Sequence, residues 1–244
     1  MSGTSLGDRM KTYYEDAYRS TLPRRMPVLL RLDGKAFHTF TRGMEKPFDP
    51  KFIMSMNAVA IEVCEEAQGA QFAYIQSDEI TVLLHNYKRL NSEAWFDNNV
   101  QKIVSVSAAI ASSAMTRIYG TRALFDARVF VVPEAEVVNA ILWRQQDATR
   151  NSIQMLARSI FSHKELHKKD NSELQEMCFQ AGHNWNDLPT HYRRGRFALR
   201  GERGWTIDNH PPILSADRNY VEKHLAVTDG AQAILGATTE AQEG

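Results

Sequence analysis

Apolar and polar residues recur along the first part of the chain with periods that predict both helices and strands. A polar helical pattern covers residues 8–20, and an apolar run predicts a strand over 26–32. Residues 50–67 carry apolar side chains at helical spacing. Asp49-Pro50 supplies a cap and a first-turn proline for this helix, which we expect to end at Gly69.

Three further elements complete a recognisable order. Two short runs rich in β-forming residues lie at 70–76 and 79–85, and Ser77-Asp78 between them predicts a tight hairpin. An amphipathic helix is expected over 94–119 and a strand over 124–132. The order strand, helix, strand, strand, helix, strand is the split pattern of ferredoxin-like folds. We therefore expect an α+β fold with a βαββαβ core.

The remainder of the chain is predicted to be mostly helical. Residues 134–161 indicate one long helix or two, and a charged helical pattern follows near 163–180. We expect residues 1–133 to form the core with its N-terminal helix, and 134–225 to form a helical and arginine-rich region packed on it. Residues 226–244 lack aromatic side chains and are predicted to be a disordered tail.

Composition narrows the class of protein. Hydrophobic residues make up 43% of the chain and charged residues 24%, as in globular domains. No apolar run approaches the roughly 20 residues that span a bilayer, and the N-terminus lacks the apolar core of a signal peptide, so we expect a cytoplasmic protein without membrane association. Cys64 and Cys178 are too few and too far apart to indicate a disulfide framework or a zinc cluster. The net charge is zero, so a polyanionic partner requires a local basic patch.

Two acidic pairs, Asp33-Gly34 and Asp78-Glu79, lie at the ends of predicted strands. Such pairs are usually solvated turns. With right-handed crossovers, however, the third strand is antiparallel to the first, so its start lies beside the end of the first strand. Oxygen ligands of this kind suit Mg²⁺ in phosphoryl transfer. Asp33 and Asp78 are the candidate ligands of two Mg²⁺ ions, with the Gly34 carbonyl as a backbone ligand and Glu79 as an additional or outer carboxylate.

Several short segments, from near the N-terminus to about residue 200, carry a more specific resemblance. They are Gly7-Asp8-Arg9-Met10-Lys11-x-Tyr13-Tyr14-Glu15, Arg31-x-Asp33-Gly34-Lys35-x-Phe37-His38-x-Phe40-Thr41, Lys46-Pro47-x-Asp49, Gln76-Ser77-Asp78-Glu79, Asp126-x-Arg128, Trp143-Arg144-Gln145-x-Asp147 with Asn151, and Tyr192-Arg193-x-Gly195. In their order and spacing the chain resembles the histidine-tRNA guanylyltransferase family, and within it the bacterial and archaeal guanylyltransferase-like branch of 3′-to-5′ RNA polymerases.

This resemblance implies a polymerase-like palm. Asp33, Gly34 and Asp78 would hold two Mg²⁺ per active site, and Glu79 would support catalysis. ATP and GTP are the implied substrates, tRNA is the implied macromolecular partner, and the implied assembly is a homotetramer. The residues expected to bind the nucleotide are Lys35, Ala36, Phe37, His38, Lys46 and Ser77.

The resemblance also implies a reaction. ATP activates the 5′-monophosphate of a tRNA, and the 3′-hydroxyl of an incoming nucleoside triphosphate then attacks that phosphate. Eukaryotic members that add G(−1) to histidine tRNA carry a His-Ile-Asn-Asn-Leu-Tyr-Asn segment, of which only Asn151 corresponds within residues 149–155. The departure favours templated repair of 5′-truncated tRNAs over G(−1) addition.

Two other functions are alternatives to nucleotide addition at the 5′ end of tRNA. A nucleotide cyclase on the same scaffold would not need the helical and arginine-rich region after residue 133. A non-enzymatic RNA-binding protein would not need an intact set of Asp33, Asp78 and Glu79.

Other residues have both an RNA-binding interpretation and a simpler one. Residues 192–205 interleave arginines with aromatic residues, which suits phosphate contacts and base stacking. The same sequence pattern is also typical of a solvated arginine-rich strand or hairpin. Arg144 could pair with Asp147 on one helix face instead of contacting RNA. His163 and His167 have the spacing of a zinc pair but no third ligand, which favours a surface helix. The candidate RNA-binding residues are Arg144, Asn151, Arg193, Arg194 and Arg196.

Overall fold

A six-stranded antiparallel sheet organises the chain. The computed structural model describes residues 5–87 and 91–225, and the sheet order is β4-β1-β3-β2-β5-β6. The expected disordered tail at 226–244 lies outside the described residues. The strands are β1 (Val28–Gly34), β2 (Ala70–Gln76), β3 (Glu79–Leu84), β4 (Phe125–Val131), β5 (Arg196–Gly201) and β6 (Gly204–Asp208).

The first four strands have the order β4-β1-β3-β2, with a helix between β1 and β2 and another between β3 and β4. This confirms the predicted ferredoxin-like core. The helices are α1 (Leu6–Met10), α2 (Phe37–Phe40), α3 (Pro50–Glu66), α4 (Val100–Tyr119), α5 (Glu134–Ile160), α6 (His163–Leu166), α7 (Asn171–Gln180), α8 (Thr190–Arg194) and α9 (Asn219–Glu222).

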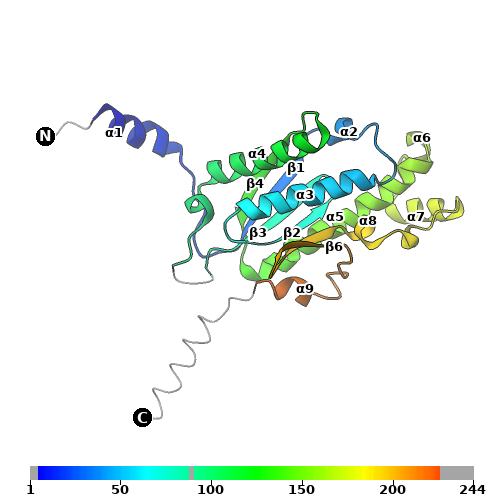
Figure 1. Cartoon of the computed structure of the whole chain (residues 1–244). Coiled ribbons are helices and arrows are strands. Elements are labelled where there is room, and N and C mark those ends of the chain that lie inside the picture. The colour runs from blue at the N-terminus through cyan, green and yellow to red at the C-terminus, as the bar shows by residue number, and fades with distance from the viewer. Residues whose placement is uncertain (1–4, 88–90, 226–244) are drawn as a thin grey trace, which may run out of the picture.

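Helices cover both faces of the sheet (Figure 1). Leu30 and Leu32 of β1 are buried with side chains of α3 and α4, whereas Leu29 is buried with side chains of α5 on the opposite face. Because side chains alternate along a strand, Arg31 and Asp33 share the α5 face with Leu29. None of the helices in the described part of the chain is long and apolar enough to cross a membrane.

Two predicted elements have different limits in the structure. The strand expected at 26–32 begins and ends two residues later, because its pairing with β4 continues to Gly34. The helix expected over 94–119 begins at Val100, where Asn99 caps it by accepting a hydrogen bond from the Lys102 N–H at 3.0 Å. Trp95–Asn98 forms a separate short 3₁₀ segment that contains residues with positive φ.

The expected helical and arginine-rich region also contributes two strands to the sheet. Phe197 pairs with Tyr74 and Ala198 with Ala73, so the hairpin of β5 and β6 extends the sheet beyond β2. Gly195 precedes this hairpin with φ +71°, and a Cβ there would lie 2.6 Å from the Ile75 carbonyl oxygen. The sheet therefore contains strands from both sides of the domain boundary predicted at residue 133. The boundary itself stays a prediction.

Candidate active site

The two acidic pairs meet at one end of the central strands. Asp33 of β1 lies opposite Glu79 of β3 in the antiparallel ladder, and the Gly34 N–H donates a hydrogen bond to the Asp78 carbonyl at 3.1 Å. On its other side Asp33 lies opposite Asp126 of β4. The prediction that the strand order makes neighbours of the two pairs is confirmed.

Burial and mutual repulsion disfavour the charged forms of these carboxyl groups. The pKa of Asp33 is raised by burial and by the Asp126 carboxylate, against the opposing effect of nearby arginines. The pKa of Asp78 is raised chiefly by burial, and the negative charges of Asp33 and Glu79 add to the rise. No ion pair to Asp33 or Asp78 within 4.0 Å occurs in the described part of the chain.

Such a pair is suited to a divalent cation, because a positive charge offsets both the repulsion and the desolvation. The donor set would be the carboxylates of Asp33 and Asp78 with the Gly34 carbonyl, all oxygens as Mg²⁺ requires. Among residues 5–87 and 91–225, no three His, Cys, Asp or Glu side chains form a group that could hold a metal. The fit therefore rests on two carboxylates and one backbone oxygen.

Glu79 is held away from solvent by an ion pair. The Arg144 guanidinium on α5 donates from Nε to one Glu79 oxygen at 2.7 Å and from Nη2 to the other at 2.8 Å. It also donates to Asp147 at 2.6 Å, and it lies 4.3 Å from the ring centroid of Trp143. Arg144 is 7% exposed, and it forms the Arg–Asp pair that the sequence also allowed. It holds Glu79 in place, and its role as an RNA contact stays a prediction.

A cavity of about 540 Å³ opens beside Gly34 and Asp78, within the size range of small-molecule sites. Ala36, at φ +57°, is the left-handed residue that precedes α2. Asp49 borders the cavity and caps α3 by accepting a hydrogen bond from the Phe52 N–H at 2.8 Å. The predicted nucleotide-binding residues that line the cavity are Ala36, Phe37, His38, Lys46 and Ser77. Lys35 is exposed and does not line it.

The last turns of α5 complete the cavity with residues that the sequence did not single out. Met155, Arg158 and Ser159 line the wall opposite the α2 segment. Arg158 belongs to no sequence motif, and its position in the cavity wall becomes evident only from the packing of α5 across the sheet. An exposed arginine in this wall is a candidate contact for a phosphate group.

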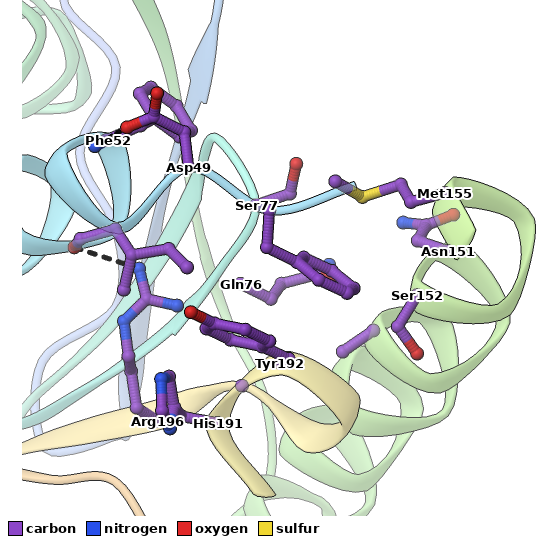
Figure 2. Close-up of a pocket in the computed structure, with 14 residues that line it drawn as sticks. Asp49, Phe52, Gln76, Ser77, Asn151, Ser152, Met155, His191, Tyr192 and Arg196 are labelled. Carbon is purple, nitrogen blue, oxygen red and sulfur yellow. Dashed lines mark hydrogen bonds between the residues drawn. The ribbon is translucent and has the colours of Figure 1, made fainter. Parts of the chain in front are cut away.

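A smaller hollow of about 50 Å³ adjoins the first and shares Asp49, Phe52, Ser77 and Met155 with it. Figure 2 shows Asn151, Tyr192 and Arg196 around this hollow. Tyr192 stacks on Phe48 with ring centroids 4.5 Å apart. Asn151, a candidate RNA-binding residue, therefore lies at the junction of α5 with the cavities.

Arg196 does not lie on the surface. It is 2% exposed, and its guanidinium donates to the Asn57 side chain and, at 3.3 Å, to the Ile53 carbonyl. Burial lowers the pKa of Arg196 to about 10. Arg196 thus lies against α3 and lines the smaller hollow, and its role as an RNA contact stays a prediction.

Arg193 and Arg194 on α8 are half-buried and lie nearer the surface. The Arg193 guanidinium lies 5.3 Å from the centroid of the Trp185 ring, and the Arg194 carbonyl accepts a hydrogen bond from the Tyr74 hydroxyl at 2.7 Å. Their predicted role as RNA contacts stays a prediction.

Gly34→Ala is expected to weaken nucleotide binding about tenfold and to lower the free energy of unfolding by about 1–3 kcal/mol. A Cβ at this position would lie 2.4 Å from Cγ of Phe37, which lines the cavity and is buried in the core. Calorimetric titration with ATP and urea unfolding would measure both effects. Gly43→Ala is the matched control, since nothing lies within 4 Å of its Cβ position. Equal ATP affinity of the two variants would contradict the prediction.

Comparison with known proteins identifies related sequences and structures. The family described as tRNAHis guanylyltransferase matches residues 7–133. A bacterial tRNA(His) guanylyltransferase (Thg1)-like protein in complex with ATP is 42% identical, with a TM-score of 0.88 over 92% of this chain and 100% of that one. A bacterial Thg1-like protein in complex with GTP is 40% identical, with a TM-score of 0.82 over 93% of this chain and all of that one. The probable tRNA(His) guanylyltransferase of Drosophila melanogaster is 29% identical over 71% of this chain and 66% of its own length.

Proposed function

The chain belongs to the tRNAHis guanylyltransferase family, and on this premise we propose that it extends tRNA at the 5′ end, in the 3′-to-5′ direction, using a template strand. The proposal rests on the proximity of Asp33 and Asp78 and on the cavity of nucleotide size that Asp78 and Gly34 line. The preferred substrate in this proposal is a 5′-truncated tRNA. The working protein in this proposal is a cytoplasmic homotetramer.

Asp33, Asp78 and the Gly34 carbonyl would hold two Mg²⁺ ions. When bound, these ions would lower the pKa of an attacking hydroxyl and offset charge on the leaving group. Arg144 binds both oxygens of Glu79 and so fixes this carboxyl group at the border of the site. Its negative charge would help to retain the cations.

The cavity beside the acidic pair would bind the nucleoside triphosphate. Lys46 is exposed at its rim, so its ammonium group can approach a phosphate. The backbone N–H groups that follow Ala36 at the start of α2 offer further donors to anionic oxygens. Arg158 on the opposite wall would contact phosphate from the α5 side. Positioning by these groups brings the reacting atoms together, which is the main task of a phosphoryl-transfer enzyme.

The proposed reaction has two steps. First, a 5′-phosphate oxygen of the tRNA attacks the α-phosphate of ATP, and pyrophosphate leaves. Second, the 3′-hydroxyl oxygen of an incoming nucleoside triphosphate attacks the activated 5′ phosphate of the tRNA, the hydroxyl proton is released, and AMP leaves. Each step forms one P–O bond and breaks one. The bacterial relatives bound to ATP and to GTP support nucleotides as substrates.

The choice between repair and G(−1) addition rests on the sequence of α5. Residues 149–155 retain only Asn151 of the segment found in eukaryotic members that act on histidine tRNA, and Asn151 lies at the smaller hollow beside the nucleotide cavity. Without the other residues of that segment, base pairing with the opposite acceptor strand is the remaining means of selecting the nucleotide. This supports templated repair.

The test is extension of a 5′-monophosphorylated tRNA that lacks its first nucleotide, in the presence of ATP, all four nucleoside triphosphates and Mg²⁺. We expect addition of the single nucleotide that pairs with the template, at a kcat/KM well above that for G(−1) addition to intact histidine tRNA. Faster G(−1) addition would overturn the repair proposal in favour of its alternative. Formation of a cyclic nucleotide without tRNA extension would favour a cyclase.

A further inference from the structure

A further hollow, lined by several basic side chains, adjoins the nucleotide cavity at Arg158. It has a volume of about 470 Å³ and is formed by the end of α5, by α6 and by the linker to α7. Arg158 lines both this hollow and the nucleotide cavity, so the two spaces adjoin at one exposed side chain. We refer to Arg158, His163, Lys164, His167 and Lys168 together as the α5–α6 basic surface. All five are exposed.

This surface carries an excess of positive charge in a chain whose net charge is zero. Between residues 158 and 169, four cationic side chains stand against one carboxylate, Glu165. That carboxylate accepts hydrogen bonds from the Ser162 N–H at 2.8 Å and hydroxyl at 2.7 Å, and Lys169 pairs with Glu173 at 2.8 Å. Within the described part of the chain, Arg158, Lys164 and Lys168 form no ion pair with a carboxylate.

The backbone that carries these lysines is fixed by local interactions. Ser162 and Glu165 form a capping box at the start of α6, Leu166 packs against the buried cluster around α7, and Asp170 caps α7. The lysine side chains thus project from a defined turn. Fixed positive charges without paired anions are suited to a polyanion with evenly spaced charges.

We infer that the α5–α6 basic surface binds the phosphate backbone of the tRNA whose 5′ end enters the acidic site. The inference rests on the proposed function, because it takes tRNA as the polymer whose 5′ end enters the acidic site, and Arg158 lines both the nucleotide cavity and the adjoining hollow. The buried position of Arg196 strengthens it, since the arginine-rich stretch around β5 presents less surface charge than its sequence predicts. The contacts are to phosphate and carry no sequence preference.

The experiment compares two double variants of the full-length protein in tRNA binding, measured by fluorescence anisotropy between 50 and 200 mM salt without nucleotides. Lys164→Ala/Lys168→Ala is expected to weaken tRNA binding roughly tenfold and to reduce the slope of log affinity against log salt by about 1–2. Lys102→Ala/Lys223→Ala, which removes two exposed lysines elsewhere on the molecule, is the matched control and should leave the slope unchanged. Lys164→Glu/Lys168→Glu should weaken binding further.

The outcomes separate this inference from the proposed function. An unchanged slope in both alanine variants overturns the basic surface as the RNA site, whether or not the wild-type protein extends tRNA. A reduced slope in Lys164→Ala/Lys168→Ala alone supports the surface even if no extension is detected, in which case only the enzymatic proposal fails. Tight binding of a polyglutamate peptide to this surface, without tRNA binding by the wild type, assigns it to an acidic protein and overturns the inference.

Discussion

Asp78→Asn is expected to lower kcat for nucleotide addition about a thousandfold while making the metal-free protein more resistant to unfolding. The loss follows because a neutral amide binds Mg²⁺ weakly and leaves the charge of the reacting phosphates unopposed, an effect of several kcal/mol. The gain follows because the substitution removes a partly buried negative charge, whose pKa is raised chiefly by burial and further by the charges of Asp33 and Glu79. Single-turnover extension of a truncated tRNA and thermal unfolding in EDTA would measure the two effects.

Addition of Mg²⁺ should reduce or reverse the difference in thermal stability between wild type and Asp78→Asn. A cation that binds the native state alone raises the melting temperature, so wild type should be stabilised by Mg²⁺ and Asp78→Asn much less. Asp126→Asn is the matched control. Asp126 lies opposite Asp33 on β4 but is half exposed, with its carboxylate 3.7 Å from Arg128, and it does not line the nucleotide cavity. Retention of wild-type activity by Asp78→Asn, or its loss in Asp126→Asn alone, would contradict the proposed ligand set.

Arg144→Met is expected to lower the free energy of unfolding by about 3–5 kcal/mol, because it leaves the buried Glu79 carboxylate without its cation. We expect kcat to fall as well, since Glu79 would lose the two hydrogen bonds that hold its side chain in place. The KM for ATP should change little, because Arg144 does not line the nucleotide cavity. Urea unfolding and steady-state kinetics would separate the effect on stability from the effect on catalysis.

The double variant Arg144→Met/Glu79→Leu provides the control. Replacing both members of a buried ion pair with apolar side chains often restores stability, so this protein should unfold near the wild-type midpoint and yet remain impaired in kcat. Arg144→Lys should fall between wild type and Arg144→Met, because one ammonium cannot bind both carboxylate oxygens in the same fork geometry. If Arg144→Met had wild-type stability but bound tRNA more weakly, the result would contradict this prediction and support Arg144 as an RNA contact.

The strand order and the meeting of the acidic pairs were predictable because both follow from local patterns and one topological rule. Short runs rich in β-forming residues marked β2 and β3, and right-handed crossovers then placed Asp78 beside Asp33. The strand limits were less predictable. Asp33 and Gly34 look like turn residues, but pairing with β4 keeps Gly34 within the strand.

The burial of Arg144 and Arg196 was not predictable from the sequence, for a common physical reason. An arginine among aromatic residues has the same sequence pattern on a surface as in an interior, and the burial of its side chain depends on the element packed against it. The partner of Arg144 lies on β3, on the sheet face that α5 covers. Arg196 begins a strand whose pairing with β2 places its side chain against α3. Neither contact is encoded locally.

The acidic site is placed by a hydrogen-bond ladder together with the two-residue turn at Ser77-Asp78 that closes the β2–β3 hairpin. Asp33 and Glu79 are opposite each other in register, and the Asp78 carbonyl is tied to the Gly34 N–H. Register changes only in whole residues, and a slip by one residue reverses which side chains face the site. Small backbone shifts therefore leave Asp33 opposite Glu79. Substitutions in the segment around α2 and in the last turns of α5 change the cavity wall and leave the ladder intact.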